Sequence, residues 1–163
     1  MARAAIAAWR EGFRGIVPDE IDPVEAWRPE RISERLRDPS YDTRSILVAA
    51  VDGEIAGLVV SGPSRDRDLD SGEGEVMALY VHPSHWRRGV GRALVAGAVA
   101  EIDASGQVEA IVWTLAESPR NIAFYESLGF ALDGGRQRRP NFGSTLEVRL
   151  RASVSNLPRR GGM

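Results

Sequence analysis

The sequence predicts a mixed α/β domain (α+β) in which a mostly antiparallel sheet is flanked by helices. Two β-rich runs, 45–51 and 54–61, are joined by Asp52-Gly53, the strongest short-range signal for a β-hairpin. Helical patterns separate the later β-rich runs, but the order lacks the strict strand–helix repeat of a doubly wound parallel sheet. With 163 residues and no internal repeat, the chain is expected to form one domain with its own core.

Each expected element has a local signal. Apolar residues from Ala4 to Phe13 recur at helical spacing, and Asp38-Pro39 ends a second helix. Ser118-Pro119 supplies an N-cap and a first residue for a late helix, and Asp133-Gly134-Gly135 is expected to turn or bulge the strand after it. In order, the expected elements are helices over 4–15 and 29–37, strands over 45–51, 54–61 and 75–81, a helix over 90–103, a strand over 107–115, a helix from 119 to Gly129, and strands from 130 and over 145–151.

Two segments are expected to lie outside this framework. The charge run Arg65-Asp66-Arg67-Asp68 is expected to be a solvated tip between two strands. The last predicted strand alternates apolar and charged residues up to Arg151, and residues 152–163 are expected to be a disordered tail. The predicted domain therefore comprises residues 1–151.

Composition excludes several functional classes. The formal net charge of −2 predicts neither a nucleic acid nor an anionic membrane as partner. No stretch has the length of a membrane span or the layout of a signal peptide, so a cytoplasmic location is expected. The chain has no cysteine and only two histidines, which excludes disulfides and thiolate sites and predicts no metal cofactor. All 21 basic residues are arginine, so no lysine is available for a Schiff base.

Residues 79–94 contain the most informative motif. An apolar strand ends at Val81, and Gly89-Val90-Gly91 opens a helix rich in small residues. Glycines allow close approach of the backbone to a ligand, and the first N–H groups of a helix have no intrahelical partner. These groups and the positive end of the helix dipole predict a site for an anion such as pyrophosphate. Full positive charges around this site come from Arg87, Arg88 and Arg92.

A second motif, over 117–130, ends in Tyr125 and Gly129-Phe130. With the first, it resembles the GNAT superfamily of acetyl-CoA-dependent N-acyltransferases. The acyl-CoA signature of that family, Gln/Arg-x-x-Gly-x-Gly/Ala, maps onto 86–91 with both glycines matching and Trp86 at the first position.

The later family pattern matches in part. Its Asn and Ala positions fall on Ser118 and Asn121, whereas its Tyr and Gly-Phe positions match Tyr125 and Gly129-Phe130. The tyrosine's role therefore transfers by this resemblance, and the asparagine contact does not.

The resemblance implies direct transfer of an acetyl group from acetyl-CoA to a primary amine of a small molecule or peptide, without a metal. It implies that backbone groups of Leu79, Tyr80 and Val81 pair with the pantetheine arm, in a strand splayed from its neighbour. Ser118, Asn121 and Tyr125 complete the expected acetyl-CoA site with the signature loop. Many family members begin with a strand, whereas this chain opens with a helical pattern, so either the sheet lacks that strand or the true start of the protein lies upstream. Homodimer formation is left open.

The family also suggests an acid and a base. Tyr125 is the expected general acid toward the CoA sulfur, and a role in the helix core is the competing interpretation. Glu75 has the spacing from Gly89 at which the histone-type members keep a catalytic glutamate, and it is the expected base. A solvent-facing carboxylate, with deprotonation through ordered water, is an equal alternative for Glu75. Histidine is a common acid or base in enzymes, but the loop position of His82 and His85 favours contacts with phosphates or solvent.

The acceptor pocket is expected between the first two helices and the late hairpin, with Trp9, Phe13, Trp27 and Phe142 as candidate lining residues. A nucleotide-binding domain is a poor alternative, because the Gly-x-x-x-x-Gly-Lys-Ser/Thr and Gly-x-Gly-x-x-Gly forms are both lacking. A non-catalytic acyl-CoA-binding or sensing protein is an open alternative, which the departures from the two motifs favour.

Overall fold

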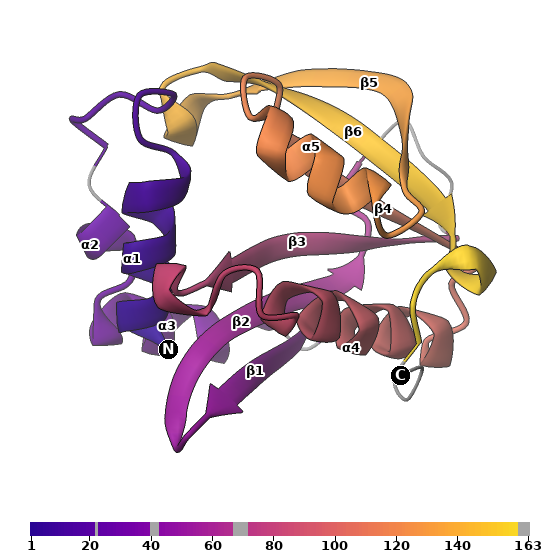
Figure 1. Cartoon of the computed structure of the whole chain (residues 1–163), viewed down its shortest axis with the longest axis horizontal. Helices are drawn as coiled ribbons and strands as arrows, with labels where there is room; N and C mark the ends of the chain where they lie inside the picture. The colour runs from indigo at the N-terminus through magenta and orange to yellow at the C-terminus, as the bar shows by residue number, and fades with distance from the viewer. Residues whose placement is uncertain (22, 40–42, 67–71, 160–163) are drawn as a thin grey trace.

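The computed structural model describes residues 1–21, 23–39, 43–66 and 72–159. Its helices are α1 (Ala2–Gly12), α2 (Pro23–Ala26), α3 (Pro29–Arg37), α4 (Val90–Ala104) and α5 (Pro119–Glu126), and its strands are β1 (Ser45–Val51), β2 (Glu54–Pro63), β3 (Glu73–Val81), β4 (Glu109–Leu115), β5 (Ala131–Arg139) and β6 (Thr145–Ser153). The six strands form one sheet in the order β1-β2-β3-β4-β6-β5 (Figure 1). Only the β3–β4 pair is parallel, which confirms the predicted mixed, mostly antiparallel sheet.

Local signals position most of these elements. Asp52 and Gly53 join β1 to β2 with positive φ angles of 51° and 80°, the conformation that a type I′ hairpin turn requires. Ser118 is the N-cap of α5, and a register shift between Leu132 and Arg136 makes the predicted bulge in β5. The single-turn helix α2 was not predicted, because four residues are too short to show a periodicity.

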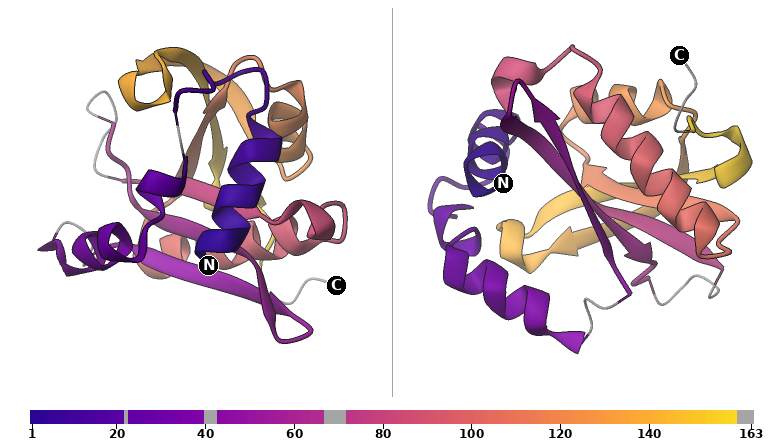
Figure 2. Two further views of the ribbon diagram at one scale, coloured as in Figure 1. Left: turned by 90° about the vertical axis from the view of Figure 1, so that its left-hand side faces the viewer. Right: turned by 90° about the horizontal axis from the view of Figure 1, so that it is seen from below.

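The helices lie on both sides of the sheet. The buried face of α4 and residues of α5 pack with alternate residues of β2, β3 and β4 in the main apolar core. Helix α1 contacts β2 and β3 near the end of the sheet, and α1, α2 and α3 lie on the side away from α4 (Figure 2). None of the helices within the described ranges has the length and apolarity needed to cross a bilayer.

A β-bulge in β3 changes which residues face each side. Val60 pairs with Ala78, but Ser61 pairs with Val76, so Met77 is the extra residue. Val76 faces the core with α4, whereas Met77 and Ala78 both line a cavity on the opposite face. The bulge thus resets the alternation just before the segment 79–81.

Two expectations need correction. In the charge run 65–68, Arg65 is exposed as expected but also binds Glu75, whereas Asp66 is half-buried and binds Arg149, so both residues are held by ion pairs; Arg67 and Asp68 lie outside the described residues. Residues 152–157 were expected to be disordered, but Ala152 extends β6 and three apolar side chains of this segment are buried in the core with α4. These side chains belong to Ala152, Val154 and Leu157.

Candidate active site

The candidate site begins where β3 and β4 separate. The two strands pair over Glu73–Val76 and Glu109–Val112, and their pairing stops there although both strands continue. The last residues of β3 therefore remain paired with β2 on one side and open to the splay on the other (Figure 1). A splay of this kind was expected from the family resemblance.

The hydrogen-bond pattern tells which backbone groups face the splay. The His82 amide donates to the Ala56 carbonyl, and in an antiparallel ladder the residues that exchange such bonds alternate. By this alternation, Tyr80 directs its backbone groups toward β2, whereas Leu79 and Val81 direct theirs into the splay. The expected contact between the Tyr80 backbone and acetyl-CoA disagrees with this geometry. The expected contacts of the Leu79 and Val81 backbones with acetyl-CoA agree with it.

The signature loop leads directly from the splay to α4. Arg87 and Gly89 have positive φ angles of 62° and 84°, and Gly89 is the N-cap of α4. Residues 87–89 are exposed, so the amides that open α4 are accessible to an anion at the positive end of the helix dipole. Gly91 has a different reason to be glycine, because a Cβ there would lie 3.3 Å from the Phe124 ring of α5.

The other residues expected to bind acetyl-CoA flank this loop. Arg92 turns toward α5, where its Nη2 donates to the Ser127 carbonyl at 3.3 Å. Ser118 is buried and caps α5 without a side-chain hydrogen bond to the helix, while the Asn121 amide donates to the Ser118 carbonyl. The His82 Nδ1 lies 2.7 Å from Ser84 Oγ, and its phosphate contact stays a prediction.

Tyr125 is buried on the α5 side of the splay, with 7% of its surface exposed. Its ring packs edge-on against Phe124 and Phe130, at centroid distances of 5.1 and 5.9 Å. Burial, and to a smaller extent the neighbouring Tyr80, raises the pKa of Tyr125 above its ordinary value. The phenol is therefore a protonated donor at neutral pH, which suits an acid and does not exclude its structural role in the core.

The Tyr80 side chain, which was not expected to have a separate role, faces the other way from its neighbours. Its ring stands perpendicular to Trp27 at 5.4 Å and lines the cavity with Ala78. Burial raises the pKa of Tyr80 to about 12, although the charges of Arg139 and Arg35 oppose the shift. No sequence signal distinguished this side chain, because its orientation depends on the bulge at Met77.

Glu75 is held in an ion pair. Its side chain is almost fully buried, and its carboxylate accepts bonds from the Arg65 backbone amide and Nε, each at 3.1 Å, and from Arg65 Nη2. Glu75 is absent from the residues that line the cavity in the described part of the chain, whereas Arg65 lines it. This geometry fits neither the solvent-facing carboxylate nor an available base, and Glu75 instead anchors the β2–β3 loop.

The cavity on this face has a volume of about 930 Å³. It lies between the N-terminal helices and β1–β3, and it also reaches Phe142 after β5. Of the four aromatic residues expected to line the acceptor pocket, Trp9, Trp27 and Phe142 line this cavity. Phe13 packs edge-on against Trp9 at 4.9 Å and lines an adjoining pocket instead.

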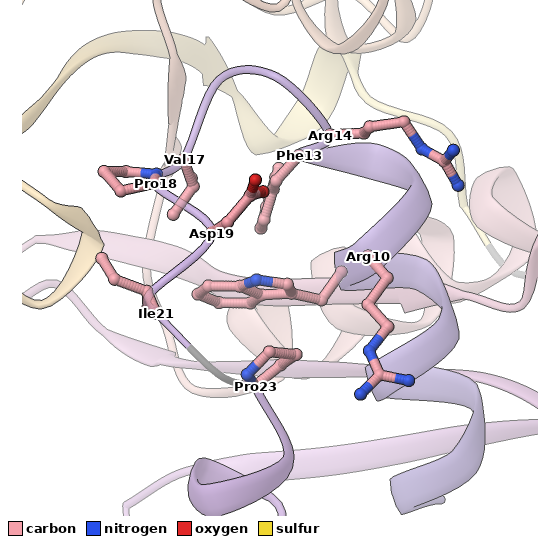
Figure 3. A pocket seen from close by; sticks show the side chains of 9 residues that line it. Arg10, Phe13, Arg14, Val17, Pro18, Asp19, Ile21 and Pro23 are labelled. Carbon is pink, nitrogen blue, oxygen red and sulfur yellow. The ribbon is translucent and has the colours of Figure 1, made fainter.

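The adjoining pocket, of about 520 Å³, lies between α1 and the loop after it. Figure 3 shows Arg10 on α1 across the pocket from the loop residues Val17, Pro18 and Ile21. Trp9, Ile21 and Pro23 line both this pocket and the larger cavity, so the two spaces are neighbours.

Comparisons with known proteins identify the family of the chain. Residues 5–130 match the family model described as the acetyltransferase (GNAT) family. The chain belongs to this family of acetyltransferase enzymes, and its fold is that of the family. Its structure resembles that of the ribosomal-protein-alanine N-acetyltransferase from Brucella melitensis, with a TM-score of 0.71, 22% identity and 93% of each chain covered. It also resembles PaiA N-acetyltransferase from Thermoplasma acidophilum in complex with coenzyme A, with a TM-score of 0.70, 19% identity, and 91% of this chain and 88% of that one covered.

Curated relatives have similar names. The chain is 26% identical over 128 residues to the uncharacterized N-acetyltransferase YuaI of Bacillus subtilis, a match covering 78% of this chain and 70% of that protein. It is 31% identical over 112 residues to the mycothiol acetyltransferase of Salinispora arenicola, covering 69% of this chain. This second match spans only 32% of the relative's length.

Proposed function

We propose that this protein transfers an acetyl group directly from acetyl-CoA to a primary amine of a small molecule or peptide. The proposal rests on residues 79–81 of β3, which direct groups toward two different sides of the strand. Leu79 and Val81 direct backbone groups into the splay beside the signature loop, while Tyr80 between them directs its side chain into the large cavity. Donor and acceptor would thus approach the same segment from two sides.

The donor side fits acetyl-CoA, which would supply the acetyl group as a thioester. The exposed amides at Arg87–Gly89 and the start of α4 would bind its pyrophosphate. The splay-facing groups of Leu79 and the Val81 amide would hold the pantetheine arm, and an N–H group there would polarise the thioester oxygen.

Proton transfer is divided between the protein and water. As the new C–N bond forms and the C–S bond breaks, the Tyr125 hydroxyl would donate a proton to the departing sulfur. Because its pKa is raised by burial, the hydroxyl is protonated at neutral pH and has a proton to donate. Because the Glu75 carboxylate is bound to Arg65, the amine would lose its proton to water in the cavity.

The acceptor side fits an amine with an apolar or aromatic body. Trp9, Trp27, Tyr80 and Phe142 provide flat apolar surfaces around the cavity, and arginine and carboxylate groups lie among them. One structural relative is named for a ribosomal-protein alanine, which supports a peptide amine as one acceptor class.

The proposal is tested by thiol release from acetyl-CoA across a panel of peptide and small-molecule amines. Amine-dependent release of CoA, with a product heavier by one acetyl group, is expected. Tight binding of acetyl-CoA without turnover on any amine of a broad panel would overturn the proposal in favour of the non-catalytic acyl-CoA-binding alternative.

A further inference from the structure

Two side chains near the departures from the family motifs lie against each other. Trp86 occupies the first signature position, and Arg120 comes two residues after Ser118. The Arg120 guanidinium carbon lies 4.3 Å from the centre of the Trp86 ring, a cation–π distance. This contact therefore joins the loop between β3 and α4 to α5 across the splay, beside the signature loop.

Trp86 is itself fixed in place. Its indole Nε1 donates to the Val81 carbonyl at 2.6 Å, so the ring closes the end of β3 and is half-buried. This bond also occupies the one carbonyl that Val81 directs into the splay. Trp86 thus forms a rigid platform between the backbone groups assigned to pantetheine and the amides assigned to pyrophosphate.

Arg120 lies on this platform with its side chain exposed to solvent, where it is accessible to a ligand. In the part of the chain that the structure describes, it makes no ion pair, and its Nη2 lies 3.7 Å from the position that a Cβ on Gly12 would take. It is also a cation in the first turn of α5, where the helix dipole disfavours positive charge; the first turn itself has no acidic residue, and Glu117 lies just before the N-cap. A bound anion would give the guanidinium a charged partner and would offset its unfavourable interaction with the helix dipole.

We propose that Arg120, held on Trp86, binds a phosphate group of acetyl-CoA. Its guanidinium supplies, from α5, positive charge next to the signature position where the family has Gln or Arg and this chain has Trp86. The inference rests on the proposed function, since it needs acetyl-CoA as the ligand. Guanidinium groups bind phosphate through paired, charge-assisted hydrogen bonds, and the stacked ring restricts the side chain before binding.

Calorimetric titration with CoA at two salt concentrations tests the inference. Arg120→Met keeps a long apolar side chain on Trp86 and removes the charge, so the Kd should rise about 10-fold at low salt, the loss of one charge-assisted hydrogen bond. The loss should shrink at high salt, because exposed charges are screened. Arg120→Lys should retain part of the affinity, and Arg136→Met, which removes an exposed arginine on edge strand β5, should bind as wild type does.

Three results would overturn the inference. Arg120→Met could bind CoA as wild type does, could lose the same affinity at both salt concentrations, or could lower the melting temperature of the ligand-free protein enough to explain the loss. The last two results would assign Arg120 to packing on Trp86. Failure of the wild-type protein to bind CoA at all would instead overturn the proposed function.

Discussion

Arg149 on β6 joins Asp66 in the β2–β3 loop through an ion pair of 2.8 Å between Nη1 and Oδ2. The side chains of both residues are largely buried, at 8% and 12% exposure. The Trp113 indole donates to the same carboxylate at 3.0 and 3.1 Å, so three parts of the chain meet at Asp66. Because Arg65 is the preceding residue, this contact also fixes the arginine that binds Glu75.

Replacing Asp66 with Ala should destabilise the fold. The substitution leaves part of the positive charge of Arg149 buried without its partner, a loss of about 3 kcal/mol in the free energy of unfolding. Urea denaturation measures the loss. Asp103→Ala is the matched control, because Asp103 pairs with Arg159 at an exposed site and should change stability by less than about 1 kcal/mol. Equal losses in the two variants would contradict a structural role for Asp66.

Asp133 is the second carboxylate bound to Arg149, and it predicts that the stability of the fold depends on pH. Burial raises the pKa of Asp133, but the Gly135 amide, Arg149 and Arg151 outweigh burial and lower it below the ordinary value of 3.8. A group with a lowered pKa in the folded state stabilises the fold above its unfolded pKa. This contribution is therefore complete near neutral pH and is lost as the pH falls below about 4.

Thermal unfolding of Asp133→Asn between pH 2 and 7 tests this dependence. The variant should melt at a lower temperature than wild type near pH 7, and the difference should narrow as the pH approaches 2. A constant difference across this range would exclude Asp133 as a source of acid sensitivity.

These carboxylate contacts mark the limit of what the sequence predicts. The hairpin at Asp52-Gly53 and the N-cap at Ser118 follow from the conformational preferences of a few adjacent residues, and both were predicted correctly. The partner of Asp66 lies 83 residues away, and many arginines could have taken that place. Such pairings depend on strand order and register, which single-sequence periodicity does not determine.

The candidate site was predictable to a similar degree. Glycine spacing located the signature loop, because a left-handed backbone at the start of a helix demands it at Gly89. The glycine spacing did not show that Gly91 is required for packing against Phe124. It also did not show that the bulge at Met77 directs Tyr80 into the cavity. The buried position of Leu157 was missed for a related reason, since isolated apolar residues in a short segment have no periodicity.

Tyr125→Phe tests the proposed acid. The substitution keeps the ring against Phe124 and Phe130 and removes only the hydroxyl, so folding and CoA affinity should be retained. General acid catalysis typically contributes about 10²- to 10⁴-fold, and kcat should fall within this range. Steady-state kinetics and a CoA titration of the same variant measure both quantities. An unchanged kcat, under conditions in which chemistry limits turnover, would leave Tyr125 with a packing role alone.

Glu75→Gln tests the anchoring role against the role of base. Gln keeps the shape but weakens the bonds to Arg65, so we expect a stability loss of about 1–3 kcal/mol. The pH profile of kcat/KM should keep the shape of the wild-type profile. Activity that is lost near neutral pH and recovers at alkaline pH, where more amine is already neutral, would restore Glu75 as the base. Arg65→Met should match the stability loss if the pair acts as one unit.

The bulge at Met77 has a consequence for how this enzyme could diversify. Beyond it, the side chains of Ala78 and Tyr80 line the cavity, while those of Leu79 and Val81 pack against the core. Ala78 and Tyr80 could therefore be substituted to admit new amines without altering the backbone groups of Leu79 and Val81 that are assigned to acetyl-CoA. Deleting Met77 would remove the bulge but would keep Val76 opposite Ser61 and Ala78 opposite Val60, so the two sets would keep their sides and only the cavity surface contributed by Met77 would be lost.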